Sequence, residues 1–130
     1  MSRRPWLKPL RRGRTWLALW LLAILALVVV CLLPGSDLPQ LSVSDKLEHA
    51  LAFLLLSSGA VQLFLRGKPL AIVVLGLLAL GVAIELAQAL LTTSRMMEAG
   101  DVVADAVGVA IGIACAWTPL KDVLLRLDPR

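Results

Sequence analysis

Residues 70–91 read LAIVVLGLLALGVAIELAQALL, a stretch whose one ionisable side chain is Glu85. A helix of this length and composition can cross a hydrocarbon layer of about 30 Å. A charged group at the centre of such a layer costs at least ~2.5–3.5 kcal/mol. The stretch therefore predicts a membrane-spanning helix, and Glu85 is a candidate functional group within it.

Three further apolar stretches lie at 15–33, 47–65 and 102–118. Backbone groups in lipid have to be hydrogen-bonded within their own segment, so these stretches also predict helices. With 59% hydrophobic residues in a chain of 130, no separate soluble domain is expected. The predicted fold class is all-α, a polytopic membrane protein built as a bundle of four transmembrane helices.

The basic residues predict the orientation of this bundle. Eleven of the 13 Lys and Arg residues lie in the N-terminal tail, the 66–69 turn and the C-terminal tail. Because cytoplasmic segments carry the excess of Lys and Arg, both termini are predicted to be cytoplasmic. The net charge of +4 is explained in this way, and no nucleic-acid partner is predicted. The predicted organisation is a basic tail (1–14), a transmembrane domain (15–118) and a short interfacial tail (119–130).

Polar side chains collect at the predicted outer ends of the last three spans. Three pairs are spaced by three or four residues, so that the members of each pair share a helix face: Asp45 with His49, Glu85 with Gln88, and Asp101 with Asp105. The outer loops also hold the two remaining basic residues. The predicted ligand-binding set is Asp45, Lys46, His49, Glu85, Gln88, Arg95, Asp101 and Asp105.

Small residues indicate which way these acids point. Gly108 and Gly112 continue the helical stripe that Asp101 and Asp105 begin, and Gly81 lies one turn before Glu85. Small residues at this spacing allow membrane helices to pack closely. We therefore expect all three glycines at helix contacts and the acids inside the bundle. In the structural alternative, Asp45 and Lys46 mark a helix start, and Glu85 braces the bundle through a polar partner.

The order of these motifs resembles the VanZ-like family. That family has Asp-Lys-x-x-His on one helix, Glu-x-x-Gln on the next, an Arg in the following loop, and then Asp-x-x-x-Asn-x-x-Gly. The corresponding residues here are Asp45-Lys-Leu-Glu-His49, Glu85-Leu-Ala-Gln88, Arg95, and Asp101-Val-Val-Ala-Asp105 with Gly108. Asp105 stands where the family has Asn and adds a carboxylate. The resemblance implies a small protein of the bacterial cytoplasmic membrane, whose namesake contributes to resistance against the glycopeptide teicoplanin.

Two functions fit these residues. The first is a non-enzymatic envelope protein that binds a lipid head group or a cell-wall precursor, with Arg95 and Lys46 contacting phosphate or carboxylate. The second is a membrane enzyme in which His49 with Glu85 or Asp105 supplies acid–base chemistry, or in which the carboxylates hold a hard cation such as Mg²⁺ or Ca²⁺. An ion pathway is disfavoured because the inner halves of the helices are apolar.

The sequence predicts no cofactor and no metal. Zinc is disfavoured because the chain has a single His and its two cysteines lie elsewhere. Both cysteines, Cys31 and Cys115, are expected to be packing residues. Membrane lipids are the expected partners, and a homo-oligomer is left open.

Overall fold

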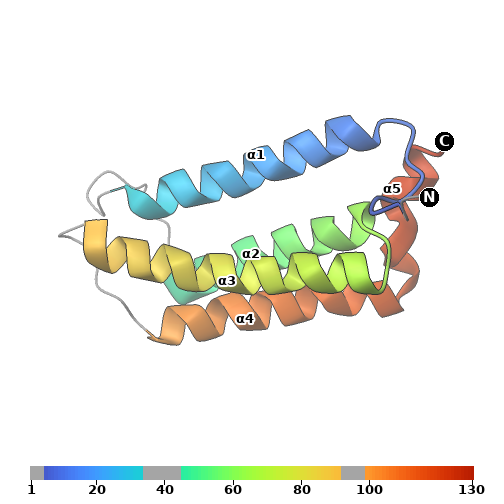
Figure 1. Cartoon of the computed structure of the whole chain (residues 1–130). Coiled ribbons are helices and arrows are strands. Elements are labelled where there is room, and N and C mark those ends of the chain that lie inside the picture. Colours follow the sequence, from blue (N-terminus) through green and yellow to red (C-terminus); the bar gives the residue numbers. More distant parts are fainter. Residues whose placement is uncertain (1–4, 34–44, 92–98) are drawn as a thin grey trace.

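The computed structural model describes residues 5–33, 45–91 and 99–130, with Asp45 described by its backbone alone. The elements in these ranges are all helices (Figure 1). The long ones are α1 (Gly13–Leu32), α2 (Asp45–Leu63), α3 (Lys68–Leu91) and α4 (Ala99–Ala114). After α4 come two 3₁₀ turns, η2 (Cys115–Trp117) and η3 (Pro119–Asp122), and the short helix α5 (Val123–Leu127).

Each long helix begins two or three residues before the apolar run that predicts it. The apolar runs stop at the first polar residues, whereas the helical backbone continues through them. The fourth predicted span, 102–118, corresponds to α4 and the 3₁₀ turn η2 that follows it directly, which together cover Ala99–Trp117. Pro119 disfavours helical geometry in the residue before it, and Thr118 is indeed extended, with φ −118° and ψ 165°.

Within the described residues, three helical segments are long and apolar enough to cross a membrane: Gly13–Leu32, Lys68–Leu91 and Ala99–Trp117, the last being α4 continued by η2. The second predicted span, 47–65, corresponds to α2, which does not meet the same criterion, because its first two turns contain two acids, a lysine and a histidine. α2 contacts each of the other long helices and buries Phe53 and Ala60 completely. A helix that faces other helices over much of its surface requires less continuous apolar surface than one that faces lipid.

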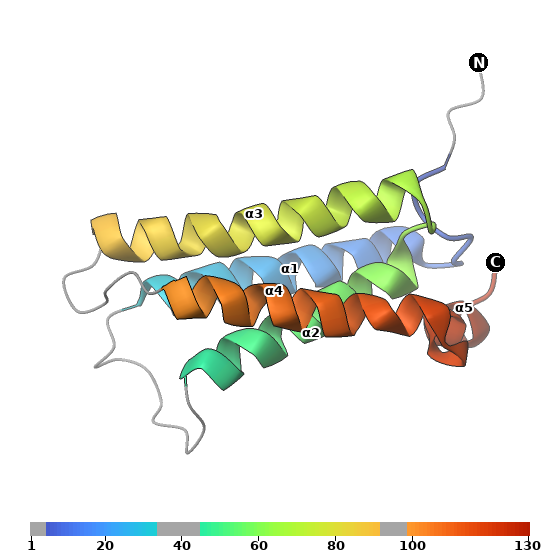
Figure 2. The ribbon, with the colours of Figure 1, turned by 90° about the horizontal axis from the view of Figure 1, so that it is seen from below.

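Successive long helices run in opposite directions, so the bundle has two distinct ends (Figures 1 and 2). At the terminal end lie both tails and the turn between α2 and α3. There the N–H of Lys8 donates to the Leu63 carbonyl at 2.8 Å, and the N–H of Leu65 donates to that of Trp6 at 2.9 Å. Gly67 completes the turn with φ 106°, a conformation that favours glycine. At the opposite end, here called the polar end, α2 and α4 begin and α1 and α3 finish.

The closest helix contact joins α2 and α4. A Cβ atom added to Gly108 would collide with the carbonyl oxygen of Ala50, and one added to Gly112 would collide with Oγ of Ser57. Both positions are therefore restricted to glycine by the backbone and side chain opposite. The prediction that these glycines lie at a helix contact is confirmed, and their contact fixes how α2 is placed along α4.

Candidate functional site

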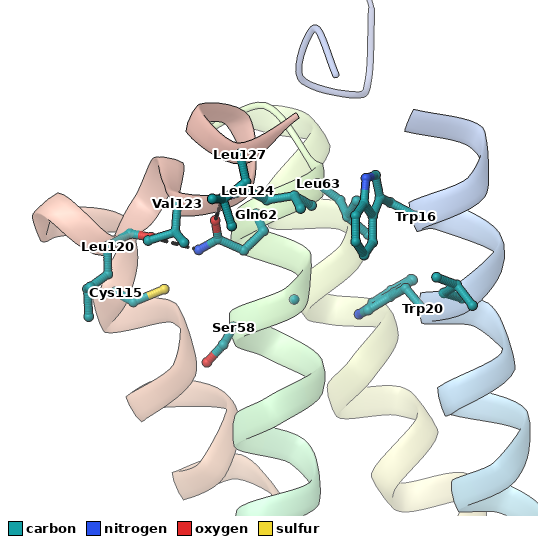
Figure 3. A pocket seen from close by; sticks show the side chains of 12 residues that line it. Trp16, Trp20, Ser58, Gln62, Leu63, Cys115, Leu120, Val123, Leu124 and Leu127 are labelled. Carbon is teal, nitrogen blue, oxygen red and sulfur yellow. Dashed lines mark hydrogen bonds between the residues drawn. The ribbon is translucent and has the colours of Figure 1, made fainter. Parts of the chain in front are cut away.

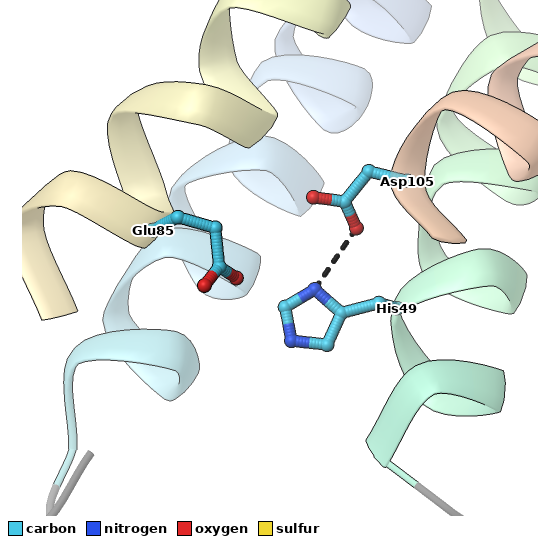
Figure 4. A group of neighbouring side chains, drawn as sticks. All are labelled: His49, Glu85 and Asp105. Carbon is cyan, nitrogen blue, oxygen red and sulfur yellow. Dashed lines mark hydrogen bonds and ion pairs between the residues drawn. The ribbon is translucent and has the colours of Figure 1, made fainter. Parts of the chain in front are cut away.

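His49 and Asp105 form a hydrogen bond between α2 and α4. Nδ1 of His49 lies 2.9 Å from Oδ1 of Asp105, and the two side chains are 8% and 2% exposed (Figure 4). The contact at Gly108, one turn after Asp105, brings the two helices close enough for this bond. A carboxylate bonded to one ring nitrogen fixes the orientation of an imidazole and the position of its proton.

Glu85 reaches the same place from α3. Its side chain is fully buried, and its carboxylate faces the other two groups (Figure 4). His49, Glu85 and Asp105 each offer a potential metal-ligating atom such that all three atoms lie within 4.8 Å of one another. We call these three residues the polar cluster. Sequence spacing predicts that they converge, and the structure brings them together from three helices.

Gly81 allows α3 to approach Asp105. A Cβ atom at this position would lie 2.8 Å from Oδ2 of Asp105, too close for a side chain to fit without rearrangement. Oδ2 itself is buried and has no hydrogen-bond partner among the residues that the structure describes. The second oxygen of this carboxylate thus retains its full capacity to accept a ligand.

A cation and a carboxylate lie at the rim of the polar end. Nζ of Lys46 is 3.9 Å from Oδ1 of Asp101, and the two side chains are 55% and 12% exposed. The stem of Lys46 lies over Gly100, where an added Cβ atom would be 2.7 Å from Cε of the lysine. Lys46 and Asp101 therefore form an ion pair that solvent can reach.

Gln88 has a different contact from the one its spacing predicts. Its side-chain amide donates to the carbonyl oxygen of Cys31 at 2.8 Å and so joins α3 to the last turn of α1. Carbonyls in the last turn of a helix lack a partner within that helix. The unpaired carbonyls expected near the end of the first span were the signal that could have predicted this bond.

Two predicted site residues cannot be placed in this arrangement. Asp45 is the first residue of α2, but its side chain lies outside the described residues, and Arg95 lies outside them entirely. Sequence reasoning also missed Ser57, which is fully buried at the α2–α4 contact. Its helical spacing from Ala50, seven residues earlier, was the available signal, because both residues face the glycines of α4.

The chemistry available at the polar cluster is binding and proton exchange. An imidazole and two carboxylates can hold a cation or pass a proton. The hydroxyls of Ser57 and Ser58, more than two turns beyond His49 on α2, both donate to the Leu54 carbonyl, at 3.1 and 2.7 Å. Cys31 packs among apolar residues, so neither kind of nucleophile is activated in the described part of the site.

A second hollow, not predicted from the sequence, lies at the terminal end between α1 and the C-terminal helices (Figure 3). It is an open groove of about 610 Å³, lined mainly by apolar side chains, including those of Trp16, Trp20 and Leu124. The amide of Gln62 donates to the Leu120 carbonyl at 2.8 Å and accepts from the N–H of Leu124 at 3.0 Å. The groove therefore offers mainly apolar surface, and its lining also includes Ser58 and Cys115.

Comparison of the chain with protein-family models, with curated proteins and with solved structures finds no match. The VanZ-like family accordingly stays a prediction from the motifs.

Proposed function

We propose that the chain is a four-span protein of the bacterial cytoplasmic membrane, with its terminal end in the cytoplasm and its polar end facing outward. Three helices of sufficient length and apolar composition support the membrane location. Exposed arginines at the start of α1 and exposed Lys121 and Arg126 in the tail support the orientation. Arg66 lies 5.0 Å from the ring centre of Trp117, a pairing typical of a membrane interface.

The polar end binds the head group of an envelope lipid or a cell-wall precursor, in the manner of a VanZ-like protein. The observation that carries this function is the burial of His49, Glu85 and Asp105 together between three helices. Stability alone does not favour such a group, because apolar residues of similar size often replace buried ion pairs without loss, or with a gain of ~1–4 kcal/mol. A binding role explains why the bundle holds ionisable groups at this depth.

Lys46 supplies the first contact for an anionic ligand. Its ammonium group is exposed at the rim, where it can meet a phosphate or carboxylate. Arg95, which the sequence predicts in the loop between α3 and α4, adds a bidentate contact of the kind that arginine makes with these groups. Acyl chains of the ligand lie along the outside of the bundle, in contact with its apolar side chains.

One observation favours an enzyme as the second candidate. The bond between His49 and Asp105 has the arrangement in which a carboxylate orients an imidazole for general acid–base catalysis. Glu85 would then hold or accept a proton on the other side of the reacting group. Formation of an altered envelope lipid by the purified protein, lost in His49→Ala, would establish this alternative.

Glycopeptide susceptibility tests the binding function in cells. A teicoplanin-susceptible bacterium is given the wild-type protein, Glu85→Gln or Asp122→Asn, with equal protein levels verified in the membrane. The wild type and Asp122→Asn, which changes only the terminal end, should raise the inhibitory concentration, whereas Glu85→Gln should return it to the vector level. Equal protection by Glu85→Gln, or no protection by the wild type, would contradict the proposed role.

The orientation requires its own test. Two reporters are fused separately after Arg130. Green fluorescent protein matures in the cytoplasm, so its fusion should fluoresce. Alkaline phosphatase requires export to become active, so its fusion should be inactive. The reverse pattern would place the polar end in the cytoplasm and exclude an outward-facing site.

A further inference from the structure

The polar cluster has the donor set of a metal site. It combines one imidazole and two carboxylates, which come from α2, α3 and α4 and are nine-tenths or more buried. The three ligand atoms lie within 4.8 Å of one another, so an ion placed between them would be no more than about 2.8 Å from each atom. This distance is somewhat longer than the ~2.0–2.2 Å of zinc–ligand bonds. Small side-chain rotations would therefore bring all three groups into contact with one ion.

A second observation points to a ligand here. Asp105 is 1% exposed, and its Oδ2 has no hydrogen-bond partner among the described residues. Figure 4 shows this oxygen on the side of Asp105 that faces Glu85, away from the bond to His49. Leaving a buried carboxylate oxygen without a partner is costly, and a bound cation removes that cost.

We propose that His49, Glu85 and Asp105 bind a divalent first-row metal ion, of the class that accepts both imidazole nitrogen and carboxylate oxygen. The sequence disfavours zinc because it has a single His, but the structure places two carboxylates beside that His, and Zn²⁺ and Mn²⁺ both accept one nitrogen and two oxygens. Two carboxylates, a neutral imidazole and a divalent cation sum to zero charge, which lowers the cost of holding these groups at membrane depth.

The ion also gives the proposed ligand a point of attachment. Three protein ligands leave at least one coordination position open, and a phosphate or carboxylate oxygen of the head group would fill it. The ion pair of Lys46 and Asp101 lies at the rim through which such a group would enter. The inference rests on the proposed function in this respect, because it assigns the ion a role in binding the same ligand.

Metal retention by the purified protein tests the inference. The full chain is purified in detergent without a histidine tag, treated with a chelator, loaded with Zn²⁺ or Mn²⁺, desalted and analysed by mass spectrometry of the elements. The informative variant is Asp105→Asn, which keeps the shape of the side chain and an oxygen for His49 but removes the charge. Asp122→Asn is the matched control, because it makes the same chemical change at the terminal end.

The wild type and Asp122→Asn should retain about one ion per chain, and Asp105→Asn should retain at least ten-fold less. The metal should also raise the unfolding temperature of the wild type but not that of Asp105→Asn, with both unfolding cooperatively in the metal-free state. Equal retention by wild type and Asp105→Asn, or none by either, would overturn the inference. If Asp105→Asn fails to fold, His49→Gln replaces it, with the same loss expected.

The two proposals fail in distinguishable ways. Metal retention that depends on Asp105, without any effect of the protein on glycopeptide susceptibility, would leave the ion in place and refute the proposed function. Protection that depends on Glu85 in a protein that retains neither ion would support the ligand site and refute the metal.

Discussion

At the terminal end, Trp16 donates its indole N–H to Oδ2 of Asp128 at 3.0 Å, and the backbone N–H of Arg12 donates to the same oxygen at 2.8 Å. At the polar end, Oδ2 of Asp105 is buried without a hydrogen-bond partner among the described residues. The carboxylate of Asp128 thus joins the two tails of the chain, whereas the carboxylate of Asp105 has one oxygen available as an acceptor. The first arrangement stabilises the fold, and the second is suited to holding a ligand.

The contrast extends to where the polar groups sit. Lys8 and Asp122, 3.0 Å apart, lie at the edge of the bundle, and the aspartate side chain is 35% exposed. His49 and Glu85 lie between helices, away from solvent. The Asp122 carboxylate keeps part of its hydration at this edge, although the side chain of its partner Lys8 is only 10% exposed. Groups between helices lose their hydration, which makes a functional reason for their presence the more economical explanation.

The largest expected effect comes from separating the helices that hold the polar end together. Gly108→Val would drive a side chain against the Ala50 carbonyl, so we expect destabilisation of at least about 3 kcal/mol or loss of folded protein. Gly76→Val is the matched control, because nothing lies within 4 Å of a Cβ atom there. Thermal unfolding in detergent measures both. Similar unfolding temperatures for the two variants would contradict the close α2–α4 contact.

A double-mutant cycle sharpens the comparison at the polar end. His49→Leu should destabilise the protein by about 1–3 kcal/mol, because Asp105 loses its hydrogen-bond partner in a buried place. Adding Asp105→Leu should recover about 1 kcal/mol or more of the summed cost, since neither polar group then remains. Denaturant unfolding in mixed micelles gives the free energies. Additive single effects would show that the two side chains do not interact.

At the terminal end, removing an acceptor should weaken the fold and leave function intact. Asp128→Ala loses the bonds from Arg12 and Trp16, and we expect it to cost about 1–2 kcal/mol. Arg130→Ala, at the exposed end of the same tail, serves as the control. Glycopeptide protection by Asp128→Ala at matched membrane levels should equal that of the wild type. A loss of protection would mean that the terminal end contributes to the site.

The smallest effect is a dependence on pH. The hydrogen bond from Lys8, with help from nearby Lys121 and Arg126, lowers the pKa of Asp122 below its usual range. Because the pKa is lower in the folded state, ionised Asp122 stabilises the fold fully above its unfolded pKa of about 3.9. This stabilisation is lost as the pH falls from there through the lower pKa of the folded state. Because the Asp122 side chain is 35% exposed, solvent screens this pair and the contribution is at most about 1 kcal/mol.

Thermal unfolding of wild type and Asp122→Asn between pH 6 and pH 3 tests this pair. The wild type should be slightly more stable at pH 6, and the difference should disappear towards pH 3. A difference that stays constant over this range would show that ionisation of Asp122 does not contribute.

Much of the bundle follows from composition. The apolar runs place the long helices to within a few residues, because helix formation in lipid leaves the backbone no alternative. The stripes of Gly81 with Glu85 and of Gly108 with Asp105 correctly indicate which faces turn inward. Whether two residues share a helix face depends only on their spacing along the helix, and the sequence gives that spacing directly.

Contacts between helices were harder to predict. Glu85 and Gln88 are three residues apart, which still leaves them about 60° apart around the helix axis. That angle is enough for Gln88 to meet α1 while Glu85 meets the polar cluster. The pairing of His49 with Asp105 likewise depends on how far α2 is shifted along α4, which the contact of Gly108 with Ala50 determines. Spacing within one helix contains no information on that shift.

The central claim is that the polar cluster serves a ligand rather than bracing the bundle. Its most direct test is mass spectrometry of the lipids that copurify with wild-type and Glu85→Gln protein, with thermal unfolding measured on the same samples. The account predicts that an anionic envelope lipid or precursor is enriched over the host membrane in the wild type. It should fall at least ten-fold in Glu85→Gln at a similar unfolding temperature. Identical lipid profiles with a lower unfolding temperature in Glu85→Gln would show a structural brace and contradict the claim.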